Sequence, residues 1–158
     1  EPEVIYTVEP SVSPLDHGGD GFVVHRLPDG RLLFRLWEVK KSASGSVSGT
    51  VSTAYAQLEE RAPEYLARLI PQEQRHPDPE VRGLVSRSII EWEQGGDEAS
   101  AGVAVTLSKG DLPAQCFTTF PHRFGRMRTP NRLRGLLAGL DDLVTFADRV
   151  RDEVWSGL

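Results

Sequence analysis

The sequence predicts an α/β protein in which helices cover a sheet. Two apolar, β-rich runs flank the turn Pro28-Asp29-Gly30, which indicates a β-hairpin between residues 19–27 and 31–40. Apolar side chains then recur at helical spacing over residues 47–70, and a second helical segment runs from Pro79 to about Glu93. Because the chain has 158 residues, we expect residues 1–158 to form one domain with a full core.

The elements of the first half follow from local signals. Residues 4–8 are a short strand candidate, and Pro10 ends it. After the hairpin, residues 41–46 are rich in serine and glycine and are expected to form a loop. Pro63 lies inside the helical pattern of residues 47–70, so it should kink that helix or begin a second piece.

The second half should add one more helix, two strands and a long terminal helix. Asp78-Pro79-Glu80 is an N-cap followed by an acidic first turn, and Gly95-Gly96 should end that helix. Residues 101–107 and 115–120 alternate well enough to extend the sheet as two strands. Thr129-Pro130 should cap a helix through about Trp155, whose apolar stripe covers the sheet or binds a partner helix.

Composition bounds the function classes. The formal net charge is −5, which argues against a stand-alone, high-affinity DNA-binding domain. Cys116 is the one cysteine, so no internal disulfide can form and a cytoplasmic location is the simplest expectation. No stretch of the sequence is apolar enough to cross a membrane. The four histidines show no zinc-binding spacing, and the Ser/Gly-rich loop lacks the ending of a P-loop.

The open end of the hairpin carries the strongest chemical signal. If the turn is centred on Asp29, Asp20 falls directly opposite Glu38, where partner Cβ atoms lie about 5 Å apart. Lys40 shares a strand face with Glu38 because side chains alternate. Two facing carboxylates repel unless a cation lies between them. A hard divalent ion with oxygen ligands, Mg²⁺ or Mn²⁺, is the expected occupant.

A second interpretation of this hairpin end stays open. Glu38 and Lys40 could be ordinary surface charges at a solvated end of the hairpin. Against that, they close a strand that is otherwise rich in Leu, Phe and Trp. Such a strand should be mostly buried, and buried charges need partners.

The pattern of Asp20, Glu38 and Lys40 resembles the PD-(D/E)xK nuclease superfamily, which has the restriction-endonuclease-like fold. The resemblance covers roughly residues 16–62. It implies a mixed central sheet with helices on both faces, and metal binding by the Asp and the Glu together with the Val39 carbonyl. It also implies that the lysine positions or activates the attacking water.

A polar residue on the following helix often completes the site in this superfamily. Gln57 occupies that place here, pointing away from the stripe of Tyr55 and Leu58, either at the site or at water. Many members also carry a helix with a further Glu before the first strand. That helix is missing here, replaced, or outside the given sequence, and Glu3 and Glu9 are the candidates for its carboxylate.

Arginines gather between the last expected strand and the terminal helix. Arg123, Arg126 and Arg128 form the core of the only basic cluster of this acidic chain, and Phe124 lies among them. The cluster is interpreted either as a clamp on backbone phosphates with a stacking aromatic, or as a solvated loop that balances acidic neighbours.

Together these observations predict a Mg²⁺- or Mn²⁺-dependent nuclease, with DNA as the expected substrate. The runs Gly18-Gly19-Asp20-Gly21 and Val39-Lys40-Lys41-Ser42 look similar to bacterial anti-phage effector nucleases, including those of Hachiman-type systems that work beside a helicase. A partner protein or further domain, such as a helicase, would then supply the grip on phosphates. The rival hypothesis is a non-catalytic module of the same fold that docks a protein or a nucleic acid.

Overall fold

A computed structural model describes residues 2–8, 20–42, 47–108, 113, 115–127, 132–140, 142, 145–146 and 148–149. The strands are β1 (Glu3–Val8), β2 (Gly21–Arg26), β3 (Leu32–Ser42), β4 (Ala99–Ser108) and β5 (Leu133–Leu140). The helices are α1 (Val47–Glu73), α2 (Pro79–Gln94), the short α3 (Phe120–Arg123) and the 3₁₀ turn η1 (Gly125–Met127). None of the helices in these described ranges is long and apolar enough to cross a membrane.

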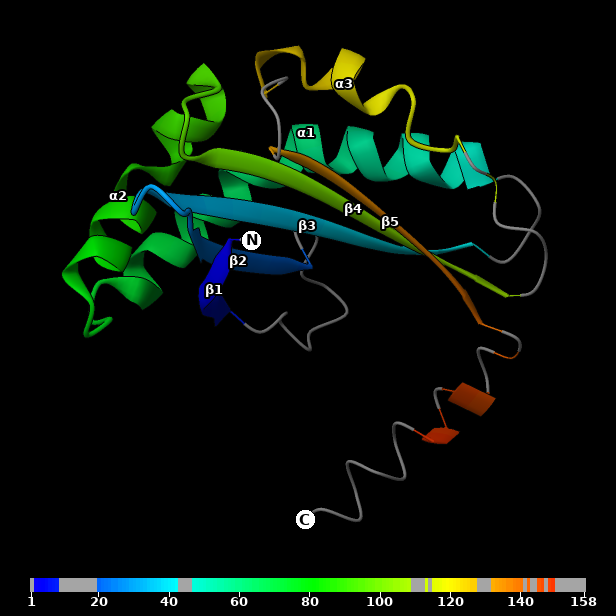
Figure 1. Cartoon of the computed structure of the whole chain (residues 1–158), viewed down its shortest axis with the longest axis horizontal. Coiled ribbons are helices and arrows are strands. Elements are labelled where there is room, and N and C mark those ends of the chain that lie inside the picture. The colour runs from blue at the N-terminus through cyan, green and yellow to red at the C-terminus, as the bar shows by residue number, and fades with distance from the viewer. Residues whose placement is uncertain are drawn as a thin grey trace.

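The five strands form one mixed sheet in the order β1-β2-β3-β4-β5 (Figure 1). β1, β2 and β3 are antiparallel neighbours, whereas β3, β4 and β5 run parallel. The two long helices form the crossover between β3 and β4, which parallel neighbours require. The expectation of an α/β protein with a mixed sheet packed against helices is confirmed. Among the described residues, however, the helices cover one face of the sheet, whereas the resemblance implies helices on both faces.

The hairpin has the register that its turn predicts. Gly21 pairs with Trp37 and Arg26 pairs with Leu32. The turn closes through a 2.9 Å bond from the Gly30 N–H to the Leu27 carbonyl, and Gly30 takes a φ of 87°, which favours glycine. At the other end the Asp20 N–H donates to the Trp37 carbonyl at 2.8 Å. Asp20 therefore lies beside Glu38, as predicted.

Helix α1 runs without interruption through Pro63, so the expected second piece does not form. An internal proline costs a helix roughly 3 kcal/mol. Ala62 and Leu66 on either side of it are fully buried, and this packing holds the helix together. Helix α2 begins and ends as predicted: the Asp78 side chain accepts the Glu80 N–H at 2.8 Å, and Gly95 adopts a left-handed φ of 64°.

Two predictions for the second half are wrong. Residues 115–119 form turns instead of a strand, and Phe120 begins α3, where its ring stacks on Tyr55 at 4.5 Å. Residues 133–140, expected within the terminal helix, form strand β5. Strand pairing with β4 suits Gly135 and Gly139, which weaken a helix, and the Phe117 ring fills the space above Gly135. Helical backbone does occur at residues 145–146 and 148–149, whereas the rest of that expected helix lies outside the described residues.

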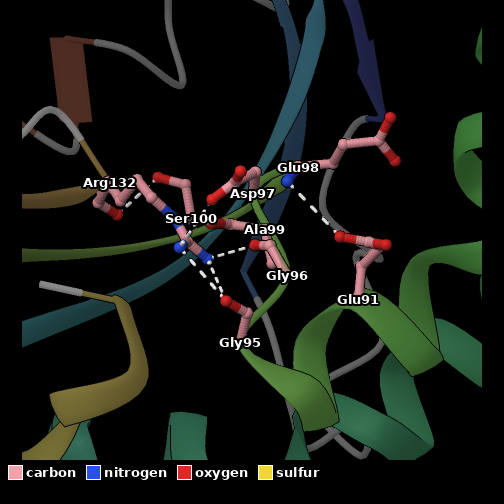
Figure 2. A network of polar contacts seen from close by, with 8 residues as sticks. All are labelled: Glu91, Gly95, Gly96, Asp97, Glu98, Ala99, Ser100 and Arg132. Carbon is pink, nitrogen blue, oxygen red and sulfur yellow. Dashed lines mark hydrogen bonds and ion pairs between the residues drawn. The ribbon is translucent and has the colours of Figure 1, made fainter. Parts of the chain in front are cut away.

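Arg132 fixes the start of β5 (Figure 2). Its guanidinium is buried and donates to the carbonyls of Gly95, Gly96 and Ala99, at 2.7 Å for Ala99. The Arg132 carbonyl accepts the Ser100 hydroxyl at 2.6 Å. One side chain thus joins the C-terminal cap of α2, the beginning of β4 and the beginning of β5.

The sheet has two different faces. The helix face carries the apolar core, and α1 and α2 pack on it, whereas α3 packs against α1 through Phe120 (Figure 1). The alternate strand residues lie on the opposite side, which we call the outer face. The outer face comprises Val4, Thr7, Gly21, Val23, His25, Leu33, Arg35, Trp37, Val39, Lys41, Ser100, Gly102, Ala104, Thr106, Arg134, Leu136, Ala138 and Leu140.

Candidate functional site

The candidate site lies where β2 ends and β3 continues. β2 pairs with β3 only as far as Trp37, so among the described residues no strand lies beside the edge of β3 beyond that point. The Asp20 carboxylate sits at this edge and accepts the Val39 N–H at 2.6 Å. The N–H and C=O of one strand residue point to the same side, so the Val39 carbonyl also points to this edge. Asp20 and the Val39 carbonyl can therefore serve one ligand.

Glu38 is buried on the helix face, with 3% of its surface exposed. Its Oε1 lies 2.5 Å from the Lys40 Nζ, whereas its Oε2 is buried and has no hydrogen-bond partner. Burial raises the pKa of Glu38, Asp20 raises it further, and Lys40 opposes both effects. Glu38 is therefore not an ordinary surface charge, and half of its carboxylate is available to a cation.

Gln57 lies at about the same level along the sheet as Glu38. Thr50 on α1 contacts Ser42 at the end of β3, with 3.1 Å between their hydroxyl oxygens. Gln57 lies seven residues beyond Thr50 on α1, a distance of about 10 Å along the helix. Glu38 lies four residues before Ser42 on β3, a distance of about 13 Å along the strand. The two side chains are therefore at similar distances from the contact between Thr50 and Ser42. Gln57 is partly buried, and its Oε1 has no hydrogen-bond partner.

The flank of α1 that carries Gln57 faces β2. Burial, and then the charge of Asp20, raise the pKa of the Tyr65 phenol, so Tyr65 lies close to Asp20. Tyr65 is eight residues further along α1 and about 80° around the helix from Gln57, on the side towards the core. The sequence interpretation had left Gln57 open between the site and water, and a buried amide oxygen on this flank favours the site. Tyr65 was not singled out from the sequence, because its helical position is also that of a core residue.

The arginine cluster lies on the other flank of α1. Arg123 forms a 3.0 Å ion pair with Glu59, which is two residues and so about 200° around the helix from Gln57. Arg126 is exposed on η1 and packs against Gly95 at the end of α2. Arg128 lies outside the described residues. The structure therefore does not bring Arg123 to the two carboxylates.

Phe124 cannot stack on a base as the sequence interpretation suggested. Its side chain is buried and meets Trp92 and Phe120 edge-on, with ring centroids 5.8 and 5.3 Å away. Phe124 is part of the core. It directly follows the turns of residues 115–119 and the short helix α3, where the sequence interpretation expected an exposed loop.

The expected third carboxylate is not found among the described residues. Glu3 pairs with Arg26, at the far end of β2 from Asp20, so it does not join the site. Glu9 lies outside the described ranges. Within those ranges no group of three or more His, Cys, Asp or Glu side chains could hold a metal ion. Any metal here would therefore depend on two carboxylates, the Val39 carbonyl and water.

Comparison with known proteins gives no identity for this site, since no protein-family model and no curated protein matches the chain. The site is therefore interpreted from its own geometry.

Proposed function

We propose that this protein is a Mg²⁺- or Mn²⁺-dependent nuclease that hydrolyses phosphodiester bonds, with DNA as its substrate. The observation that supports this most is the buried carboxylate of Glu38, which has one oxygen bound to Lys40 and the other without a partner. A buried charge that is only half satisfied is costly. A cation between Glu38 and Asp20 would remove that cost.

The donors available fit a small, hard cation. Mg²⁺ is commonly bound by one or two carboxylates and keeps several waters. Asp20, Glu38 and the Val39 carbonyl would supply three oxygen ligands from the edge of β3. Such an ion lowers the pKa of a bound water and stabilises negative charge on a phosphoryl oxygen.

Lys40 is placed to act on the reacting groups. Its side chain is 28% exposed, so its ammonium group can reach solvent while it pairs with Glu38. Its three N–H donors would orient the attacking water or neutralise charge on the phosphate. The Gln57 amide would orient a water from the opposite side of the site. These are the roles that the resemblance to PD-(D/E)xK nucleases implies.

A docking module remains the second candidate. The net charge of −5 favours it, and so does the finding that, among the described residues, no third carboxylate joins Asp20 and Glu38 at the site. We also propose, from the resemblance to anti-phage effectors, that a partner such as a helicase delivers the substrate. The acidic chain then need not hold duplex DNA tightly by itself.

The deciding experiment replaces Lys40 by alanine. Cleavage of plasmid and single-stranded substrates is measured in Mg²⁺ and in Mn²⁺, with and without the partner. Lys40→Ala should lower cleavage by ~10²–10⁴-fold, the scale of losing a group that orients a nucleophile or offsets transition-state charge. Arg31→Ala is the matched control, because it removes one positive charge at the far end of the same hairpin, where Arg31 pairs with Asp29.

Circular dichroism and metal-induced stabilisation should show that Lys40→Ala keeps its fold and its metal site. If the wild type cuts nothing with its partner present, or if Lys40→Ala cuts as well as the wild type, the protein is a docking module.

A further inference from the structure

The outer face carries an aromatic platform built from one row of residues across four strands. Gly21 pairs with Trp37, Trp37 pairs with Gly102, and Gly102 pairs with Arg134. The Trp37 indole lies flat over Gly102, since a Cβ atom at Gly102 would come within 2.5 Å of the ring. Trp37 nevertheless stays partly exposed. A flat indole on bare backbone can offer a ring face to a planar ligand.

Arginine side chains flank this indole. Arg35 Cζ lies 5.8 Å from the centre of the Trp37 ring. Arg35 is held in place by its 2.7 Å bond to the Ser100 hydroxyl, and its Nη1 lies 3.4 Å from His25 Nε2. Arg134 is exposed on β5, next to the Gly102 over which the indole lies. The Ser100 hydroxyl in turn donates to the Arg132 carbonyl, which fixes the start of β5.

The outer face is positive although the chain is acidic. Among its described strand residues there is no Asp or Glu, whereas His25, Arg35, Lys41 and Arg134 are basic. Burial, and then the charge of Arg134, lower the pKa of Arg35 to about 10, so the two guanidinium groups are close enough to repel each other. Crowded positive charge around an aromatic ring favours a ligand that is both anionic and planar.

We propose that the outer face binds single-stranded nucleic acid, with one base stacked on Trp37 and the adjoining phosphates held by Arg134 and Lys41. Stacking on aromatic side chains combined with basic residues along the backbone is the usual means of binding single strands. A duplex fits less well, because its bases are already stacked on each other. Binding at this surface does not depend on the proposed nuclease activity.

The position of Trp37 also relates this surface to the candidate site. Trp37 and Glu38 are consecutive, so they lie on opposite faces of β3, next to the edge where β2 has ended. A nucleic-acid strand that leaves the outer face at Trp37 would pass the edge of β3 beyond the end of β2 and reach Asp20. This second step rests on the proposed nuclease function, and it would deliver a single strand to the metal.

The test uses the full chain in EDTA, so that binding is measured without cleavage. Fluorescence anisotropy with a labelled oligothymidine and a labelled duplex of equal length should show tighter binding of the single strand. Stacking should also quench tryptophan fluorescence. Trp37→Phe should abolish that quenching while keeping most of the affinity, whereas Trp37→Ala should weaken binding by roughly ten- to a hundredfold.

Arg134→Ala should weaken binding to all single strands alike and lower the slope of log affinity against log salt by about 0.7, the value for one phosphate contact. Arg31→Ala is again the charge-matched control and should change neither quantity. Circular dichroism should confirm that each variant is folded.

Equal affinity for duplex and single strand, full affinity of Trp37→Ala, or quenching that survives in Trp37→Phe would overturn the proposal. Absence of any binding in EDTA would overturn it too, whatever the outcome of the cleavage assay. Loss of cleavage with binding intact would instead refute only the proposed nuclease.

Discussion

The Asp20 carboxylate accepts the Val39 N–H at 2.6 Å, in the place where a continuing β2 would have supplied a backbone carbonyl. A side chain thus satisfies the first unpaired donor of the β3 edge, and this fixes the carboxylate beside Glu38. Asp20 therefore has two roles, since it terminates the hairpin and forms half of the candidate metal site.

The first prediction separates these roles. Mg²⁺ or Mn²⁺ should raise the melting temperature of the wild type by mass action. The double variant Asp20→Asn, Glu38→Gln should lose that rise, because it has no carboxylate at the site. Differential scanning fluorimetry across a metal titration checks this. Asp29→Asn, at the hairpin turn, is the control and should respond like the wild type; an equal response of the double variant would eliminate the metal site.

The second prediction concerns pH. Burial raises the pKa of Glu38 in the folded protein, so the folded state holds this proton more tightly than the unfolded state does. The resulting contribution to stability is fully present below the unfolded pKa, near 4.5, and is lost as the pH rises through the folded value. Urea unfolding from acidic to neutral pH should show this loss in the wild type. The Glu38→Gln variant should not show this loss of stability. If the wild type and the variant have identical profiles of stability against pH, the raised pKa does not belong to Glu38.

The third prediction tests the arginine cluster. Arg123→Ala alone should change nucleic-acid binding little, since Arg123 already pairs with Glu59, and an exposed pair is worth at most about 1 kcal/mol. Replacing Arg123, Arg126 and Arg128 together should weaken binding to all sequences alike and flatten its salt dependence if the cluster grips phosphates. An unchanged slope in the triple variant would show that the cluster is a solvated surface.

The fourth prediction concerns Arg132. Arg132→Ala should destabilise the fold by about 2–4 kcal/mol, because it removes the guanidinium that donates to the buried or half-buried carbonyls of Gly95, Gly96 and Ala99. Arg132→Lys should restore only part of this, since one ammonium group cannot reproduce the planar fork. Chemical denaturation measures both variants. A loss below about 0.5 kcal/mol for Arg132→Ala, the scale of an ordinary surface change, would mean that the network is not structural.

The first half of the fold was predictable because its signals are local. The turn at Pro28-Asp29-Gly30 determines the hairpin register, and alternation then places Asp20 beside Glu38. The caps Asp78 and Gly95 bound α2 equally well. The burial of Glu38 was also expected, because the strand that it closes is rich in apolar residues. Alternation along the same strand places Lys40 on the face that carries Glu38.

The structure of residues 115–140 was not predictable because distant residues decide it. Leu133, Leu136, Leu137 and Leu140 have the spacing of a helical stripe, yet pairing with β4 makes residues 133–140 a strand. Leu136 is 55% exposed as a result. The outer-face platform was missed for the same reason: Arg134 lies in the same cross-strand row as Trp37 only because β5 lies beside β4, with Gly102 between them.

The alternation of β3 has a consequence for how this chain can change. Trp37 and Glu38 belong to two different surfaces but share one strand, so inserting or deleting a single residue upstream in β3 would exchange the faces of both. The indole would be driven into the core and the carboxylate onto the opposite surface in the same event. A substitution can therefore alter one of the two surfaces alone, whereas a change in the length of the hairpin alters both. The number of residues between Gly30 and Glu38 should therefore vary far less than the identities of those residues.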